Sequence, residues 1–155
     1  MALVIGLALR AALLATSAAV LQPSADESIQ FLLAQSIRAG ATPLLFLAQP
    51  YLFPLESYLM APFVDLLTAG AWSARLPVFI MHLGALALLL RFLCQAIPHA
   101  GARVCGAALM LLPSSYVLLV QGAYSMPGYA SMLLGGAAAF ACAAAAGRRP
   151  GQARW

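Results

Sequence analysis

Residues 76–94, LPVFIMHLGALALLLRFLC, decide the fold class of this chain. His82 and Arg91 are its ionisable side chains apart from the terminal cysteine, and every other residue is apolar or small. A helix of about 20 such residues crosses the hydrocarbon core of a bilayer. Inside lipid, a single segment can satisfy its backbone polar groups only as a helix. The stretch therefore predicts a transmembrane helix.

Three further segments have the length and composition of a membrane span: 1–21, 104–121 and 127–146. The 155 residues are 64% hydrophobic and 8% charged, with a mean hydropathy of +0.94, whereas soluble domains are about half apolar and about a quarter charged. We expect an all-α, polytopic membrane protein with about four transmembrane helices, forming one membrane module over 1–155.

The first span has an alternative interpretation as a signal peptide. Small residues in ATSAAV, 15–20, occupy plausible cleavage positions. A signal peptide begins with a basic region, however, and here Arg10 lies in the middle of the apolar run. We expect a retained signal-anchor helix.

The arginines predict the orientation of the chain. Segments rich in arginine stay in the cytoplasm. Five arginines flank the 95–102 loop and the 147–155 tail, while all four acidic residues lie in 22–75. We therefore place both termini in the cytoplasm and residues 22–75 outside, in a protein integral to the bacterial inner membrane. The five arginines are Arg91, Arg103, Arg148, Arg149 and Arg154.

Two surface helices are predicted in the 22–75 loop. Ser24 followed by Glu27 forms a capping box that opens a helix over 25–39, ending near Gly40. Its apolar residues share one face, which we expect to lie on the membrane with Gln30 toward water. A second helix is expected over 55–68, kinked or restarted at Pro62. The apolar residues of the first helix are Ile29, Leu32, Leu33 and Ile37.

The adjacent Asp26 and Glu27 have two interpretations. Carboxylates in a first helical turn interact favourably with the helix dipole, by about 0.3–1 kcal/mol. Alternatively, carboxylates on the outer side of a membrane fold act as a base or hold a cation. The sequence contains no cysteine pair or other motif with metal-ligand spacing, and no basic stripe with interleaved aromatics, so a nucleic-acid partner is not expected.

The order of short motifs resembles a known family. After the first span come the DE pair at 26–27 and RAG at 38–40, then QPYLFPLESYLMAPFVDLL at 49–67 and WSARLPVFIMHLGALALLLRFL at 72–93. GAYSMPGYASMLLGGAAAF follows at 122–140. This order resembles the start of C-type membrane glycosyltransferases that use polyprenyl-phosphate sugars, such as protein O-mannosyltransferases and the lipid A aminoarabinose transferase. The resemblance covers essentially the whole chain, through short and degenerate motifs.

The resemblance implies roles for three residues. Asp26 matches the catalytic carboxylate that deprotonates or orients the acceptor, and Glu27 matches its partner in the acidic pair. Glu56 matches a second acidic position that can help bind the acceptor or a divalent cation. Independently of the resemblance, Arg75, beside Trp72, is the candidate for contact with an anionic substrate on the outer side; an interfacial anchor formed with Trp72 is the alternative.

Complete members of the family are several hundred residues long. The resemblance therefore implies that this chain corresponds to the N-terminal part of a larger fold, inactive alone, with a partner subunit or a missing C-terminal part supplying the rest. The alternative is a small accessory membrane protein or remnant without catalytic activity.

Overall fold

The computed structural model describes residues 2–47, 52–65, 71–111 and 125–147. The described residues are helical, joined by loops. Helix α1 spans Ala2–Val20, α2 spans Ala25–Arg38 and α3 spans Leu55–Met60, followed by the 3-10 turn η1 over Ala61–Phe63. Helix α4 spans Ala71–Ala96, α5 spans Ala100–Leu111 and α7 spans Tyr129–Ala146.

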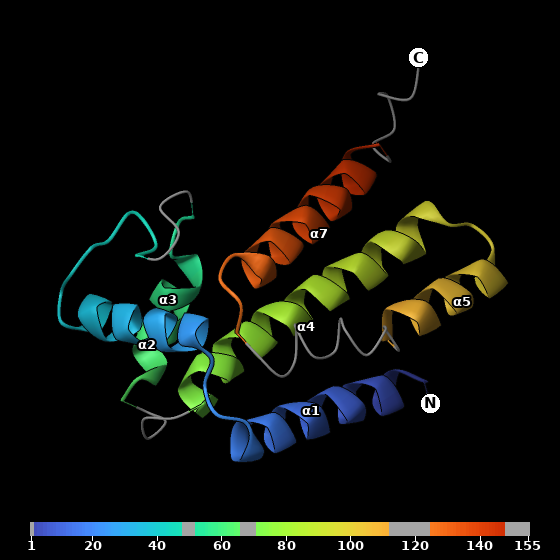
Figure 1. Cartoon of the computed structure of the whole chain (residues 1–155). Helices are drawn as coiled ribbons and strands as arrows, with labels where there is room; N and C mark the ends of the chain where they lie inside the picture. The colour runs from blue at the N-terminus through green and yellow to red at the C-terminus, as the bar shows by residue number, and fades with distance from the viewer. Residues whose placement is uncertain (1, 48–51, 66–70, 112–124, 148–155) are drawn as a thin grey trace.

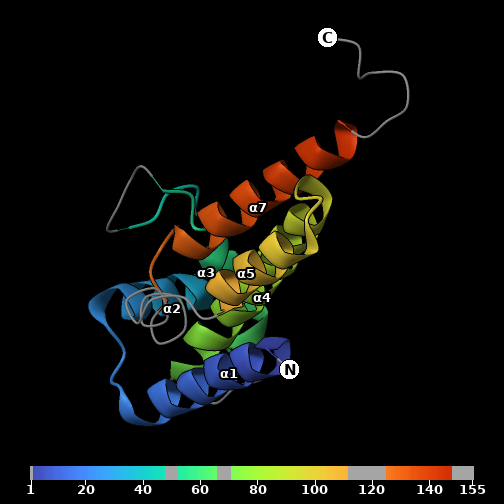
Figure 2. The same cartoon turned by 90° about the vertical axis from the view of Figure 1, so that its right-hand side faces the viewer.

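The four apolar helices, α1, α4, α5 and α7, run along one another, and α2 and α3 gather at one end of them (Figure 1). Helix α4 lies centrally: it contacts α1, α5 and α7, and its contact with α7 is the most extensive in the described chain. The start of α1 and the end of α7 lie at the end opposite α2, as Figures 1 and 2 both show.

Two helices, α4 and α7, are long and apolar enough to cross a membrane. At about 1.5 Å per residue, their 26 and 18 residues extend about 39 and 27 Å, near the thickness of the hydrocarbon core. A third candidate, α1, qualifies when it is taken together with α2 across a bend of 88°. The prediction of four spans is thus confirmed only as two to three candidate spans. Of the predicted span 104–121, the structure describes the part up to Leu111, within α5.

Helix α2 has the ends that the sequence predicts. The Oγ of Ser24 accepts the N–H of Glu27 over 3.2 Å, and the Glu27 carboxylate accepts the N–H of Ser24 over 2.9 Å, which completes the capping box. At the other end, Gly40 adopts a φ of 98°. Its N–H bonds the Ile37 carbonyl, and the next N–H bonds the Ser36 carbonyl. These are the two bonds of a Schellman motif, which a glycine at this position favours.

Two predicted helix boundaries change. Helix α4 begins at Ala71, so Arg75 lies inside a helix and not at the end of a loop; Pro77 is accommodated within it. The predicted second surface helix, 55–68, is a six-residue helix, α3, that tightens into a 3-10 turn at Pro62. Residues 66–68 of that prediction lie outside the described residues. Proline at the start of a short turn needs no N–H donor, which explains the change of helix type there.

The apolar core lies where α2, α3, α4 and α7 meet, at the end of the molecule that holds the candidate site. It is built from small residues and methionines, which let the helices approach closely. Its members are Ala34, Met60, Ala74, Val78, Met81 and Ala130, with Val64 and Leu134 packed against them.

Candidate functional site

Arg75 and Glu27 form a buried ion pair at the junction of α1, α2 and α4. The Nε of Arg75 donates to Oε1 of Glu27 over 2.7 Å, and its Nη2 donates to Oε2 over 2.9 Å. The two side chains are 1% and 0% exposed. Paired bonds between a guanidinium and a carboxylate fix the relative orientation of both groups. The pair therefore holds the start of α2 in a defined position on α4.

The same pair lies between two helix ends of opposite polarity. Nη1 of Arg75 donates to the carbonyl of Ser17 over 2.6 Å, and Nη2 lies 3.4 Å from the carbonyls of Leu21 and Gln22. Carbonyls at the end of a helix lack intrahelical donors and carry the negative end of the dipole, which a cation satisfies. Glu27 occupies the first turn of α2, where a negative charge is favourable. The charges thus stabilise the 88° bend between α1 and α2.

Glu27 also binds the segment that leads into α7. Its Oε1 accepts the N–H of Ser125 over 2.8 Å, and the hydroxyl of Ser125 donates to Oε1 of Gln30, one turn along α2. Gln30 is 1% exposed, so the prediction that it faces water is wrong. The face of α2 that carries Glu27 and Gln30 points into the protein, whereas Leu32 of the predicted membrane face is exposed.

Asp26 is placed differently from its neighbour. Its side chain is partly exposed in the first turn of α2, and it makes no hydrogen bond or ion pair with a described residue. A groove of about 340 Å³ lies between α2 and the start of α4. The neighbouring Glu27 lines this groove, whereas Asp26 does not. The rest of its lining is mostly apolar: Pro23, Ser28, Phe31, Leu32, Ala71 and Ala74.

Glu56 binds the first turn of α7. Glu56 is 2% exposed. Its Oε1 accepts hydrogen bonds from the hydroxyl of Ser131 over 2.8 Å and from the N–H of Ser131 over 3.2 Å. The N-cap residue of α7 is Gly128, which has no side chain to offer and adopts a φ of 82°. A carboxylate from α3 therefore replaces the side-chain cap that the helix itself lacks.

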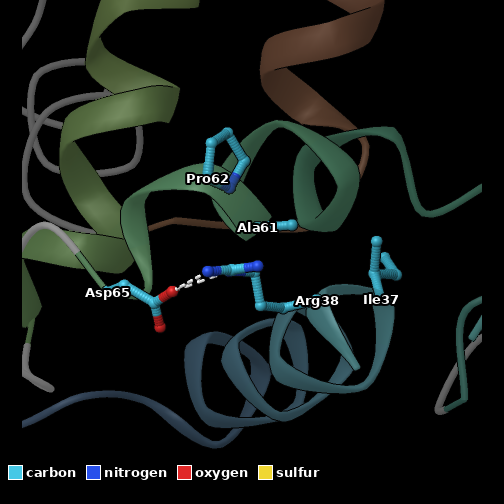
Figure 3. Close-up of a pocket in the computed structure, with 5 residues that line it drawn as sticks. All are labelled: Ile37, Arg38, Ala61, Pro62 and Asp65. Carbon is cyan, nitrogen blue, oxygen red and sulfur yellow. Dashed lines mark hydrogen bonds and ion pairs between the residues drawn. The ribbon is translucent and has the colours of Figure 1, made fainter. Parts of the chain in front are cut away.

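The fourth carboxylate, Asp65, lies with Arg38 beside an open hollow of about 560 Å³ at the end of α2 (Figure 3). Nε of Arg38 donates to Oδ2 of Asp65 over 2.7 Å, and Nη2 donates to the same oxygen. The side chains are 56% and 55% exposed. An ion pair so exposed stabilises a protein by about 0–1 kcal/mol, so it joins α2 to the segment after η1 only weakly.

A further arginine is buried outside this junction. Arg10, in α1, donates from Nη2 to the carbonyl of Met110 over 2.8 Å and from Nη1 to the carbonyl of Leu111. Nη1 also lies 3.3 Å from the carbonyl of Gly6. A charge within an apolar helix is costly unless it is paired or bonded to backbone carbonyls. Arg10 meets this condition by joining α1 to the last described residues of α5.

Of the four predicted site residues, the structure brings Glu27 and Arg75 together. Asp26 and Glu56 form no hydrogen bond with each other or with this pair, and Glu56 binds Ser131 instead. The direct catalytic and substrate-binding roles stay predictions. In the described ranges, no group of three or more His, Cys, Asp or Glu side chains could hold a metal ion.

The sequence prediction did not identify Gln30, Ser125 or Ser131 as parts of this site. The sequence did contain a signal for the burial of Gln30. Residues three or four apart share a helix face, so Gln30 lies on the same face as Glu27 and the small residue Ala34. The two serines gave no such signal, because their partners lie 75 to 98 residues away.

No protein-family model, curated protein or solved structure matches the chain.

Proposed function

We propose that this chain is the acceptor-side part of a membrane glycosyltransferase that transfers a sugar from a polyprenyl phosphate to an acceptor at the membrane surface. One observation carries the proposal. The Arg75–Glu27 pair fixes the first turn of α2 against α1 and α4, and Asp26, the next residue, is left partly exposed and unbound by described residues. A general base must be held rigidly and yet remain available to substrate.

The proposed reaction needs one base. The acceptor group attacks the anomeric carbon of the sugar, its proton passes to the carboxylate of Asp26, and the sugar–phosphate bond breaks with its electrons leaving on the phosphate oxygen. A positioned base contributes typically about 10²–10⁴-fold to such a step. Glu27 and Arg75 act here by positioning Asp26, because each side chain is enclosed and bonded to the other. A contact of Glu56 with the acceptor is retained as a prediction.

The proposal includes the four-span topology, with both termini in the cytoplasm of a bacterium and α2 and α3 on the outer side of its inner membrane. Two arrangements support it. The 88° bend lays α2 along the membrane plane if α1 crosses the bilayer. The start of α1 and the end of α7, although apart from each other, both lie on the side of the molecule away from α2 (Figures 1 and 2). The lipid-linked donor approaches from the surrounding lipid, and a partner subunit supplies further donor contacts.

A second candidate is a non-catalytic accessory protein of the membrane. The specific observation in its favour is that three of the four carboxylates, Glu27, Glu56 and Asp65, are bound by other parts of the chain and have structural explanations. If Asp26 also only stabilises the first turn of α2, the chain needs no catalytic carboxylate.

The experiment that separates these candidates measures sugar transfer from radiolabelled polyprenyl-phosphate sugars in membranes of the native host, where partner subunits are present. Asp26→Asn preserves size, leaves the Ser24–Glu27 capping box intact and removes the base. It should reduce transfer at least about tenfold, the low end of what a general base contributes. Asp65→Asn, which removes the same charge from another exposed carboxylate, serves as the matched control and should retain transfer. Equal rates for Asp26→Asn and the unaltered chain, or no transfer that depends on the chain, would favour the accessory protein.

A further inference from the structure

The loop between α2 and α3 presents large apolar side chains outward. Leu44 and Leu47 are each 74% exposed, and Leu45 and Phe53 are also more than half exposed. We call these four residues the loop apolar surface. The sequence contains no charged residue from 39 to 55.

The loop is built so that these side chains point outward. Phe46, between the leucines, is 1% exposed and anchors the segment to the protein. Its N–H donates to the carbonyl of Leu52 over 2.9 Å, which brings the two arms of the loop together. The hydroxyl of Tyr58 donates to the carbonyl of Pro43 over 3.0 Å.

Tyr58 also holds the second arm. The ring of Phe53 stacks on the ring of Tyr58, with centroids 5.8 Å apart and planes inclined by 12°. Because Phe46 takes the buried position and Tyr58 fixes both arms, the leucines cannot turn inward without breaking these contacts. Their exposure is therefore a feature of the folded loop.

The position of the loop indicates what covers it. Helix α2, from which the loop departs, lies at 88° to α1, and α4 and α7 have the length and composition of membrane spans. In both views residues 39–47 project from the α2–α3 end of the molecule on the side away from α1 (Figures 1 and 2). If α4 and α7 cross the bilayer, their α2–α3 end comes near the boundary between acyl chains and headgroups, where an apolar, uncharged segment is favourable.

We propose that the loop apolar surface inserts into the bilayer leaflet at the α2–α3 end and binds the acyl chains of its lipids. Apolar faces of interfacial segments are buried about 5–10 Å into the boundary between headgroups and acyl chains. The uncharged surface fits lipid hydrocarbon and requires no specific headgroup. This anchor holds the end of the molecule that carries Asp26 and Glu27 at the membrane surface. It does not depend on sugar transfer, so it stands or fails separately from the proposed function.

The experiment uses tryptophan fluorescence of the full chain in vesicles of brominated phosphatidylcholine. In a background with Trp72→Phe and Trp155→Phe, the Leu47→Trp variant places the fluorophore on the loop apolar surface. The Gln35→Trp variant, on an exposed polar position of α2, is the matched control. Bromine near the carbonyl end of the acyl chains should quench Leu47→Trp more strongly than bromine near the methyl end, and should leave Gln35→Trp nearly unquenched. Aqueous iodide should quench the fluorescence of Gln35→Trp more strongly than that of Leu47→Trp.

Iodide quenching of Leu47→Trp together with insensitivity to brominated lipid would overturn the proposal in favour of a water-facing loop. Insensitivity to both quenchers would overturn it in favour of a protein that covers the loop. Leu44→Trp provides an independent position, so one misfolded variant does not decide the result; a circular dichroism spectrum matching the background confirms folding.

Discussion

Nε of Arg75 lies 2.7 Å from Oε1 of Glu27, between the carbonyl end of α1 and the amino end of α2. A similar arrangement, a charged side chain at the end of a helix, is found at the start of α7, where Glu56 binds Ser131. Arg10, the other buried arginine of the described residues, binds the carbonyls of Met110 and Leu111 in α5. Glu27 and Glu56 are thus placed where helix starts leave backbone N–H groups without intrahelical partners.

The first prediction concerns this ion pair. Glu27→Gln should lower the free energy of unfolding in mixed micelles by about 3–5 kcal/mol, because it leaves the buried guanidinium of Arg75 without its counter-charge. Replacing both residues, as in Glu27→Leu with Arg75→Met, should cost less than that single change, since no uncompensated charge remains. Additive losses in the double variant would show that the two residues do not act as a pair.

The second prediction concerns the start of α7. Glu56→Ala should lower the free energy of unfolding by about 1–2 kcal/mol, because α7 then loses its cap. Ser131→Ala should have a smaller effect after Glu56→Ala than before it, since the two residues share a hydrogen bond. A double-mutant cycle by chemical unfolding measures this coupling, and zero coupling would contradict the assignment of Glu56 as the cap.

The third prediction concerns Arg10. Arg10→Met removes the donors to the Met110 and Leu111 carbonyls. Hydrogen bonds that involve a charged group contribute about 1.5–3 kcal/mol, so amide exchange in α5 should accelerate by about 10- to 100-fold. Arg91→Met, which changes an exposed arginine of α4, is the matched control and should leave exchange in α5 unchanged. Unaltered exchange after Arg10→Met would mean that other contacts hold α5.

The fourth prediction concerns the exposed pair in Figure 3. Asp65→Asn should change the free energy of unfolding by less than about 1 kcal/mol, because water screens a pair that is more than half exposed. The small difference should vanish at high ionic strength. A loss as large as that of Glu27→Gln, measured in the same micelles, would show that the Arg38–Asp65 bond is a principal link between α2 and the segment after η1.

The fifth prediction concerns topology. Reporter fusions after residues 48 and 155 should be found on opposite sides of the membrane, the first outside and the second in the cytoplasm, as the arginine distribution requires. Location of both reporters on the same side would contradict four spans and with it the outer position of Asp26.

The sequence by itself determined the local features of this protein. Apolar runs of spanning length predicted the helices α4 and α7, because a helix in lipid depends on composition along one segment. The capping box at Ser24 and the glycine at position 40 predicted both ends of α2, because these signals act through backbone groups a few residues away.

The tertiary structure alone decided which groups meet. Glu27 and Arg75 are 48 residues apart, and Glu56 and Ser131 are 75 apart, so no local periodicity specifies either contact. The same cause explains the error at Gln30: the apolar pattern of α2 suggested water over its polar face, but that face meets Ser125 inside the protein. The packing of a distant segment supplies a donor to Oε1 of Gln30, while its Nε2 has no hydrogen-bond partner among the described residues, so local sequence could not have specified this contact.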